Sequence, residues 1–221
     1  CRMAFSEAIT NAAAADIDIF TLKFSANWMA SCGSEGEDAK LYDAVKATSE
    51  FCRTLGVSIP VGKDSCSMKT GWTDDKGEAK SVTSPVSMIA SVSGPVGDIR
   101  LTLTPQLHPE TASKLIAVDL SEGRDRLGGS ILAQVVQSFG DDCPDMEDPE
   151  KLRAFVGVIR SLASEGRILA YHDRSDGGFA AAVAEMMFAG HCGLSFDVAP
   201  LLRGGDRSEE SVLRALFNEE A

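Results

Sequence analysis

The residues with the clearest chemical potential lie between Tyr171 and Gly178, where acidic and hydroxyl side chains separate a short apolar segment from two glycines. This order predicts a strand, an acidic turn and the start of a helix. Oxygen ligands beside the unpaired backbone N–H groups of a helix start suit a hydrated divalent cation and its phosphates. The alternative is structural: Asp173 and Ser175 would cap the helix, and the glycines would make a tight turn. Taken alone, such a run more often has the structural role.

A second set of oxygen ligands lies near the start of the chain. Residues 2–15 are rich in alanine with apolar side chains at helical intervals, and Glu7 and Asn11 stand four residues apart on the polar side. That spacing places a carboxylate and an amide oxygen on one helix face, so both could bind one cation. An exposed polar stripe is the alternative, and neither position decides between the two by itself.

Two further stretches could meet a ligand. Asn27 and Trp28 come at the end of an expected strand, and the turn Gly62–Ser65 combines a flexible glycine with a lysine and an aspartate. The turn is only weakly similar to a phosphate-binding loop, because it lacks the G-x-x-x-x-G-K spacing of a Walker motif.

The composition limits the partners that the chain can bind. Its 221 residues carry a net charge of −12, with 44% hydrophobic and 24% charged residues. No apolar run approaches the ~20 residues that a membrane span requires. An acidic chain is a poor general binder of nucleic acid or membrane surfaces, so neither partner is expected. A phosphate ligand would therefore need a metal ion.

The cysteines and the chain ends indicate the cellular setting. The six cysteines are scattered, with no C-x-x-C pair and no histidine at zinc-finger spacing, which predicts reduced, mostly packing residues. No targeting segment is visible, so a cytoplasmic location is expected. The chain opens on Cys1 and Arg2, and residues 216–221 lie inside an expected helix. Both features favour a piece of a longer polypeptide.

The elements that must position these side chains fall into two halves, separated by a proline-rich stretch without periodicity at 101–109. Periodicity and turn residues predict the first half: helices over 2–15 and 38–55, strands over 20–24, 57–61 and 82–92, and a hairpin tip at 74–77. In the second half, strands over 115–119, 168–171 and 194–198 alternate with helices that begin after Ser130, Asp148 and Gly178. Such alternation predicts a compact α/β domain.

Four blocks occur in an order that is typical of one enzyme family: Ser6–Asn11, Phe24–Met29, Pro60–Ser65 and His172–Gly178. Through them the chain resembles phosphoribosylformylglycinamidine synthase (FGAM synthase, or FGAR amidotransferase) of the large, single-chain type. The likeness runs through essentially all 221 residues. The chain is similar to the second of the two repeated synthetase halves of that enzyme.

The resemblance implies an α/β (α+β) fold with two partial domains. Residues 1–105 would form a domain like the N-terminal part of aminoimidazole ribonucleotide synthetase, and residues 113–221 an α/β domain like its C-terminal part. The implied activity is that of an ATP-dependent ligase of de novo purine biosynthesis, which converts formylglycinamide ribonucleotide to the amidine with ammonia from glutamine. The implied partners are ATP, this ribonucleotide and the other domains of the same polypeptide, including the glutaminase module.

Carried over residue by residue, the resemblance implies Mg²⁺ ligands at Glu7, Asn11 and Asp173, with Ser175 contacting ATP or ADP. A further aspartate ligand of the family would lie upstream of this chain, and no catalytic residue is assigned. In large members of the family, one half's nucleotide site is associated with catalysis and the other's with a structural nucleotide. A non-catalytic nucleotide-binding scaffold half is therefore the alternative.

The cysteines have no catalytic role in this interpretation. The glutaminase module, with its cysteine nucleophile, would lie beyond the C-terminal end, so none of the six cysteines is expected to act as that nucleophile. Cys66 stands where many relatives have methionine, and a packing role is expected for it.

Overall fold

The computed structural model describes residues 1–221, which form two compact units. The first consists of Cys1–Ala8 and Asp18–Pro95, and the second of Ile9–Ile17 and Val96–Ala221. Helix α1 (Arg2–Ala12) contributes its first turns to one unit and its last turns to the other. None of the helices is long and apolar enough to cross a membrane.

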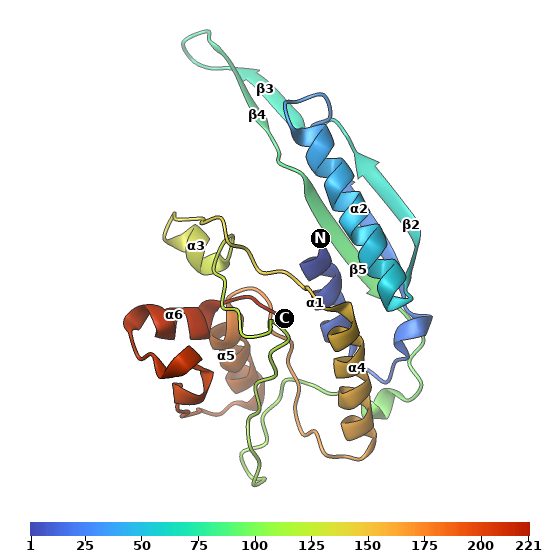
Figure 1. The fold of residues 1–221 in the computed structure, drawn as a ribbon, viewed down its shortest axis with the longest axis vertical. Helices are drawn as coiled ribbons and strands as arrows, with labels where there is room; N and C mark the ends of the chain where they lie inside the picture. The colour runs from blue at the N-terminus through green and yellow to red at the C-terminus, as the bar shows by residue number, and fades with distance from the viewer. The chain divides into compact units, whose positions relative to one another are not determined.

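The first unit is built on a three-stranded sheet with the order β2-β1-β5. Strand β1 (Lys23–Met29) runs parallel to β2 (Ser58–Ser65) and antiparallel to β5 (Ser87–Ser93). Helix α2 (Glu37–Leu55) makes the crossover from β1 to β2 and runs along the sheet, as Figure 1 shows. Strands β3 (Lys69–Thr73) and β4 (Ala79–Thr83) form a separate antiparallel hairpin.

The core of the first unit forms where α1 and β1 present aromatic side chains. The rings of Phe5 and Phe24 are both fully buried, with centroids 4.8 Å apart. The expected helix over 38–55 and the hairpin tip at 74–77 are confirmed, and the strand expected over 82–92 is interrupted at Pro85. The strand expected over 20–24 begins later. Asp18 accepts a hydrogen bond from the Phe20 backbone N–H and starts a short 3₁₀ turn, η1 (Ile19–Thr21), instead.

The second unit consists of helices and irregular segments. Besides the last turns of α1, it contains α3 (Ile131–Val135), α4 (Pro149–Ser164), α5 (Gly178–Gly190) and α6 (Glu209–Phe217). Short 3₁₀ turns occur at Ile99–Leu101 (η2), Ala199–Leu201 (η3) and Arg203–Gly205 (η4). The expected cap of α4 is confirmed, because the Asp148 carboxylate accepts from the backbone N–H groups of Glu150 and Lys151.

The strands expected in the second half are wrong: residues 115–119, 168–171 and 194–198 form no strand. A strand needs a neighbouring backbone to complete its hydrogen-bond ladder, and none of these segments pairs with one. Ile116 is accordingly 77% exposed. The helix expected to continue through 216–221 is also wrong, because α6 ends at Phe217 and Asn218 is its C-cap.

We expect limited proteolysis to cut first between Pro109 and Leu115. Upstream of this stretch, Thr104 accepts a hydrogen bond from the Tyr171 backbone N–H, and Leu107 lies against Gly190. Residues 109–114 are exposed and contain no helix or strand. Brief digestion with trypsin or a glutamate-specific protease, followed by mass spectrometry, checks this expectation. First cuts inside α2 would contradict it.

Candidate nucleotide and metal site

The turn at 171–178 is held against the C-terminal part of α1 by Tyr171. Its hydroxyl donates to the Thr10 carbonyl at 2.7 Å, and its ring lies 6.5 Å from that of Phe155. Burial, together with the nearby charge of Asp173, raises the pKa of the Tyr171 hydroxyl, so it remains a hydrogen-bond donor at neutral pH. Tyr171 therefore fixes where the following acidic residues lie. The sequence pattern did not single out this anchoring role.

Asp173 and Asn11, which are far apart in the sequence, meet in the second unit. The Asn11 amide nitrogen donates to Asp173 Oδ1 at 3.4 Å. The Asp173 side chain is only 9% exposed, and its Oδ1 also lies 3.6 Å from Nδ1 of His172. The other ring nitrogen of His172 is 2.6 Å from a Glu185 carboxylate oxygen. A half-turn of the Asn11 amide would place an oxygen beside the carboxylate, which is a donor set that suits Mg²⁺.

The two remaining predicted residues, Glu7 and Ser175, lie on the same segments as Asn11 and Asp173. Glu7 lies one turn before Asn11 along α1, and both are exposed. Ser175 is half-buried, and its backbone carbonyl accepts from the Gly178 N–H at 3.0 Å. No group of three or more histidine, cysteine, aspartate or glutamate side chains gathers as a metal site would require. The predicted ligand set consists of the two carboxylates of Glu7 and Asp173 and the amide of Asn11, so it is not a group of that kind. It stays a prediction.

The glycines of the turn fit the structural interpretation only in part. Gly177 and Gly178 have φ values of 81° and 64°, as a tight left-handed turn requires. The N-cap of α5 is Gly177, however, and no side chain caps this helix. The hypothesis that Asp173 or Ser175 caps α5 is therefore wrong, and Asp173 turns to Asn11 instead.

The backbone N–H of Gly177, the N-cap of α5, is not unpaired, contrary to expectation. Gly177 donates to Glu219 Oε1 at 2.8 Å, and the Ile131 N–H at the start of α3 donates to the same oxygen at 2.8 Å. The positive end of a helix attracts an anion, and here the chain supplies a carboxylate of its own. The last residues of the chain therefore lie where a phosphate was expected.

A charged network, missed by the sequence analysis, buries the end of the chain. Glu220 is fully buried, and its carboxylate binds the Arg126 guanidinium through contacts of 2.6 and 2.8 Å. Arg174, inside the predicted motif, donates to the Glu220 carbonyl and to Asp119. Burial opposes ionisation of Asp119, but hydrogen bonds from Arg203 and Ser121, with the charge of Arg174, give a net lowering of its pKa. Charged residues near a helix end suggest solvent exposure, so sequence alone carries no signal of this burial.

In the first unit, Asn27 and Trp28 carry polar atoms without partners. Asn27 Oδ1 and Trp28 Nε1 are buried and accept or donate no hydrogen bond within the chain. They stand opposite Lys63 and Asp64 across the β1–β2 pair. Buried polar atoms are usually satisfied, so a ligand or water at this strand end fits the arrangement. The prediction that these residues face a ligand stays open.

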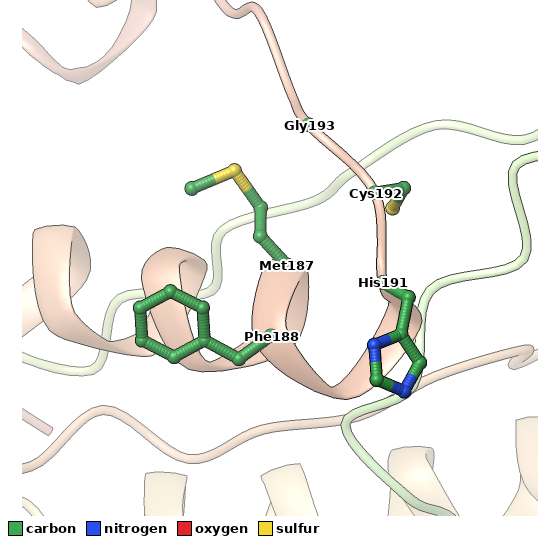
Figure 2. A pocket seen from close by; sticks show the side chains of 5 residues that line it. All are labelled: Met187, Phe188, His191, Cys192 and Gly193. Carbon is green, nitrogen blue, oxygen red and sulfur yellow. The ribbon is translucent and has the colours of Figure 1, made fainter.

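An apolar hollow of about 560 Å³ lies at the other end of α5 from the Gly177–Gly178 turn. Figure 2 shows Met187 and Phe188 on the last turns of the helix and His191 to Gly193 in the segment that leaves it. Phe188 is 73% exposed. The hollow contains none of the predicted ligands and is therefore not part of the candidate site.

Two family models match the chain on either side of residues 96–112. The FGAR-AT PurM_N-like domain matches residues 1–95, and the C-terminal domain of AIR synthase related proteins matches residues 113–220. Residues 113–220 therefore form a domain of the AIR synthase-related type, and residues 1–95 a domain of the PurM_N-like type. The predicted mixed α/β fold class, with the two domains in this order, is thereby confirmed. Asn11 lies in the first matched domain and Asp173 in the second.

Solved structures are similar to the chain at low sequence identity. HypE of E. coli, a hydrogenase maturation protein, matches with a TM-score of 0.55 and 18% identity over 99% of this chain and 61% of its own. PurL of T. maritima, solved with ATP, matches with a TM-score of 0.47 and 13% identity over 95% of this chain and 29% of its own. The chain thus spans less than two thirds of either protein. The likeness to HypE concerns the fold alone.

Proposed function

We propose that this chain supplies a magnesium-nucleotide site to a phosphoribosylformylglycinamidine synthase. Glu7, Asn11 and Asp173 would bind Mg²⁺, and Ser175 would contact ATP or ADP. The observation that carries the proposal is the 3.4 Å contact between Asn11 and the shielded Asp173 carboxylate. Helix capping does not explain the position of Asp173, because Gly177 is the N-cap of α5.

The choice among members of the family rests on the first domain. The model that matches residues 1–95 describes the FGAR-AT PurM_N-like domain, which supports the amidotransferase rather than a hydrogenase maturation protein. The proposed substrates are formylglycinamide ribonucleotide and ATP, with ammonia from a glutaminase module of the same polypeptide, in the cytoplasm. The proposed domains are residues 1–105 and 113–221.

The proposed chemistry is phosphoryl transfer from ATP to the substrate amide oxygen, followed by displacement of phosphate by ammonia. Bound Mg²⁺ would offset the phosphate charge, which an acidic chain of net charge −12 cannot do by itself. Two residues of this chain would hold the Mg²⁺ ion in place: Asp173 through its carboxylate, and Asn11 through its amide oxygen. Tyr171 would keep the turn against α1 through its bond to Thr10.

Asp173→Asn, made in the complete polypeptide, is expected to weaken magnesium-dependent binding of ADP by about tenfold or more, as loss of a charged ligand typically does. The substitution keeps the size of the side chain, so the melting temperature in excess EDTA should change little. Calorimetric titration with Mg²⁺ and ADP measures the first quantity, and thermal unfolding the second.

Asp176→Asn is the matched control, because Asp176 is exposed in the same turn. It removes the same charge but should leave the affinity within about twofold, since water and salt weaken the effect of an exposed charge that does not bind the ion itself. Unchanged ADP affinity in Asp173→Asn would contradict the ligand assignment. Weakened affinity with full turnover of formylglycinamide ribonucleotide would instead identify a structural nucleotide site.

A further inference from the structure

Cys32 and Cys66 face each other at the end of the β1–β2 pair. Ser31 and Ser67 form an antiparallel bridge, which places Cys32 opposite Cys66. The Cys32 N–H donates to the Cys66 carbonyl at 2.9 Å, and the Met68 N–H donates to the Ala30 carbonyl at 3.1 Å. These two hydrogen bonds flank the Ser31–Ser67 pair, and the first of them joins the two cysteines directly.

This arrangement has the spacing that a disulfide needs. Residues directly opposite in an antiparallel pair have Cα atoms about 4.5 to 5.5 Å apart. Disulfides join residues with Cα atoms about 4.4 to 6.8 Å apart. The neighbouring Cys32 thiol also contributes to the raised pKa of the Cys66 thiol, so the two sulfur atoms lie near each other.

The two thiols are also accessible. Cys32 and Cys66 are both exposed, whereas Cys52 is buried in the core. The sequence-based expectation that Cys66 packs is therefore wrong. An exposed thiol contributes no core packing, and a small disulfide or a peroxide can reach it.

We infer that Cys32 and Cys66 form a reversible disulfide, which makes this strand end a redox modification site. One thiolate attacks a small-molecule disulfide such as oxidised glutathione, giving a mixed disulfide and one released thiol. The second cysteine then displaces the other glutathione thiol and closes the Cys32–Cys66 bond. Two protein thiols are oxidised, one disulfide is reduced to two thiols, and excess reduced glutathione reverses the exchange.

Closure of this bond changes the neighbourhood of Asp64 and of α2. In the reduced chain the Cys66 thiol donates to Asp64 Oδ2 at 3.4 Å, and oxidation removes that proton. The loop from Cys32 to Gly36, which leads into α2, becomes covalently tied to the end of β2. Gly62–Ser65, which the sequence predicts as a turn, form the end of β2 instead and lie directly beside the modified bond.

The same contacts set the pH dependence of the exchange. Hydrogen bonds with Cys32 and then with Asp64 raise the pKa of the Cys66 thiol to about 11. The Cys66 thiolate is thus scarce at neutral pH, and its alkylation rate should rise about tenfold per pH unit between pH 7 and 10. Asp64→Asn, which removes the negative charge beside the sulfur, should speed alkylation of Cys66 at pH 7.

The test is to equilibrate the protein in mixtures of reduced and oxidised glutathione, block remaining thiols, and digest with trypsin. The inference predicts a cross-linked pair of the peptides Phe24–Lys40 and Asp64–Lys69, which reduction separates. Both cysteines should lose alkylation together, by about tenfold or more at the oxidising end of the series.

Cys32→Ser and Cys143→Ser provide the comparison, since Cys143 is an exposed cysteine elsewhere in the chain. With Cys32→Ser, Cys66 should accumulate only as a glutathione adduct, whereas Cys143→Ser should leave the cross-link unchanged. Glutathione adducts on both cysteines of the wild-type protein, without the cross-linked peptides, would overturn the inference. So would independent loss of the two thiols along the redox series.

Discussion

Arg126→Met is expected to lower the free energy of unfolding of the second unit by about 3 to 5 kcal/mol, the usual cost of leaving a buried charge without its partner. Glu220 is fully buried, and Arg126 meets both of its carboxylate oxygens as well as Glu147. Methionine fills much of the same volume, so the main loss is electrostatic rather than a cavity. Urea unfolding followed by far-ultraviolet circular dichroism measures this loss. Both tryptophans, Trp28 and Trp72, lie in the first unit, so their fluorescence would report on the wrong part of the chain.

Two variants isolate this effect. Arg100→Met breaks an ion pair with Asp98 in which the arginine side chain is 85% exposed, and it should change the stability little, because water and salt screen such a pair. Combining Arg126→Met with Glu220→Leu should recover part of the lost stability, because the uncompensated charge is then gone. Equal losses in Arg126→Met and Arg100→Met would refute the structural role of the buried pair.

Gly178→Ala is expected to destabilise the second unit by about 3 kcal/mol or more, through overpacking and a disfavoured backbone conformation. A Cβ atom at this position would lie 2.5 Å from the carbonyl oxygen of Asn218 and 2.8 Å from the backbone carbon of Phe217. Backbone atoms cannot swing aside as a flexible side chain can. The φ of 64° adds strain for any residue with a side chain. The substitution should therefore displace the tail that carries Glu219 and Glu220.

Gly157→Ala is the matched control for this position. Gly157 lies on the exposed side of α4, and a Cβ atom there would meet no other atom within 4 Å. Alanine at this position should stabilise the protein by about 0.5 to 1 kcal/mol, since glycine is a poor helix former. Hydrogen exchange at Gly177 and Ile131 shows whether Gly178→Ala also releases Glu219. A melting temperature of Gly178→Ala at or above the wild-type value would contradict the close approach of the tail.

Local chemistry made most helices predictable. Asp148 followed by a proline and a glutamate predicts the start of α4, and Gly56 in a left-handed conformation ends α2. Capping and periodicity act over one or two turns, so neighbouring residues carry the information. The hairpin at 74–77 was predictable for the same reason.

The prediction of strands in the second half was wrong because a strand depends on a neighbouring backbone segment to pair with, and not only on local sequence preference. Residues 115–119 and 168–171 have the composition of short buried strands, yet no other backbone pairs with them as a sheet. A short apolar run does not specify whether a neighbouring strand is present. The cysteines show the same limit: Cys66 resembles a packing residue in the sequence and is exposed in the structure.

For the candidate site, the sequence by itself determined the residue types: Glu7 and Asn11 at helical spacing, and an acidic run that ends in two glycines. Only the tertiary structure decided that Asn11 contacts Asp173 and that Gly177 is the N-cap of α5. It also decided that the Gly177 N–H donates to the Glu219 carboxylate. Spacing along a helix follows from the geometry of one backbone. Contacts between residues 42 to 162 positions apart depend on how the packed elements bring the chain back together.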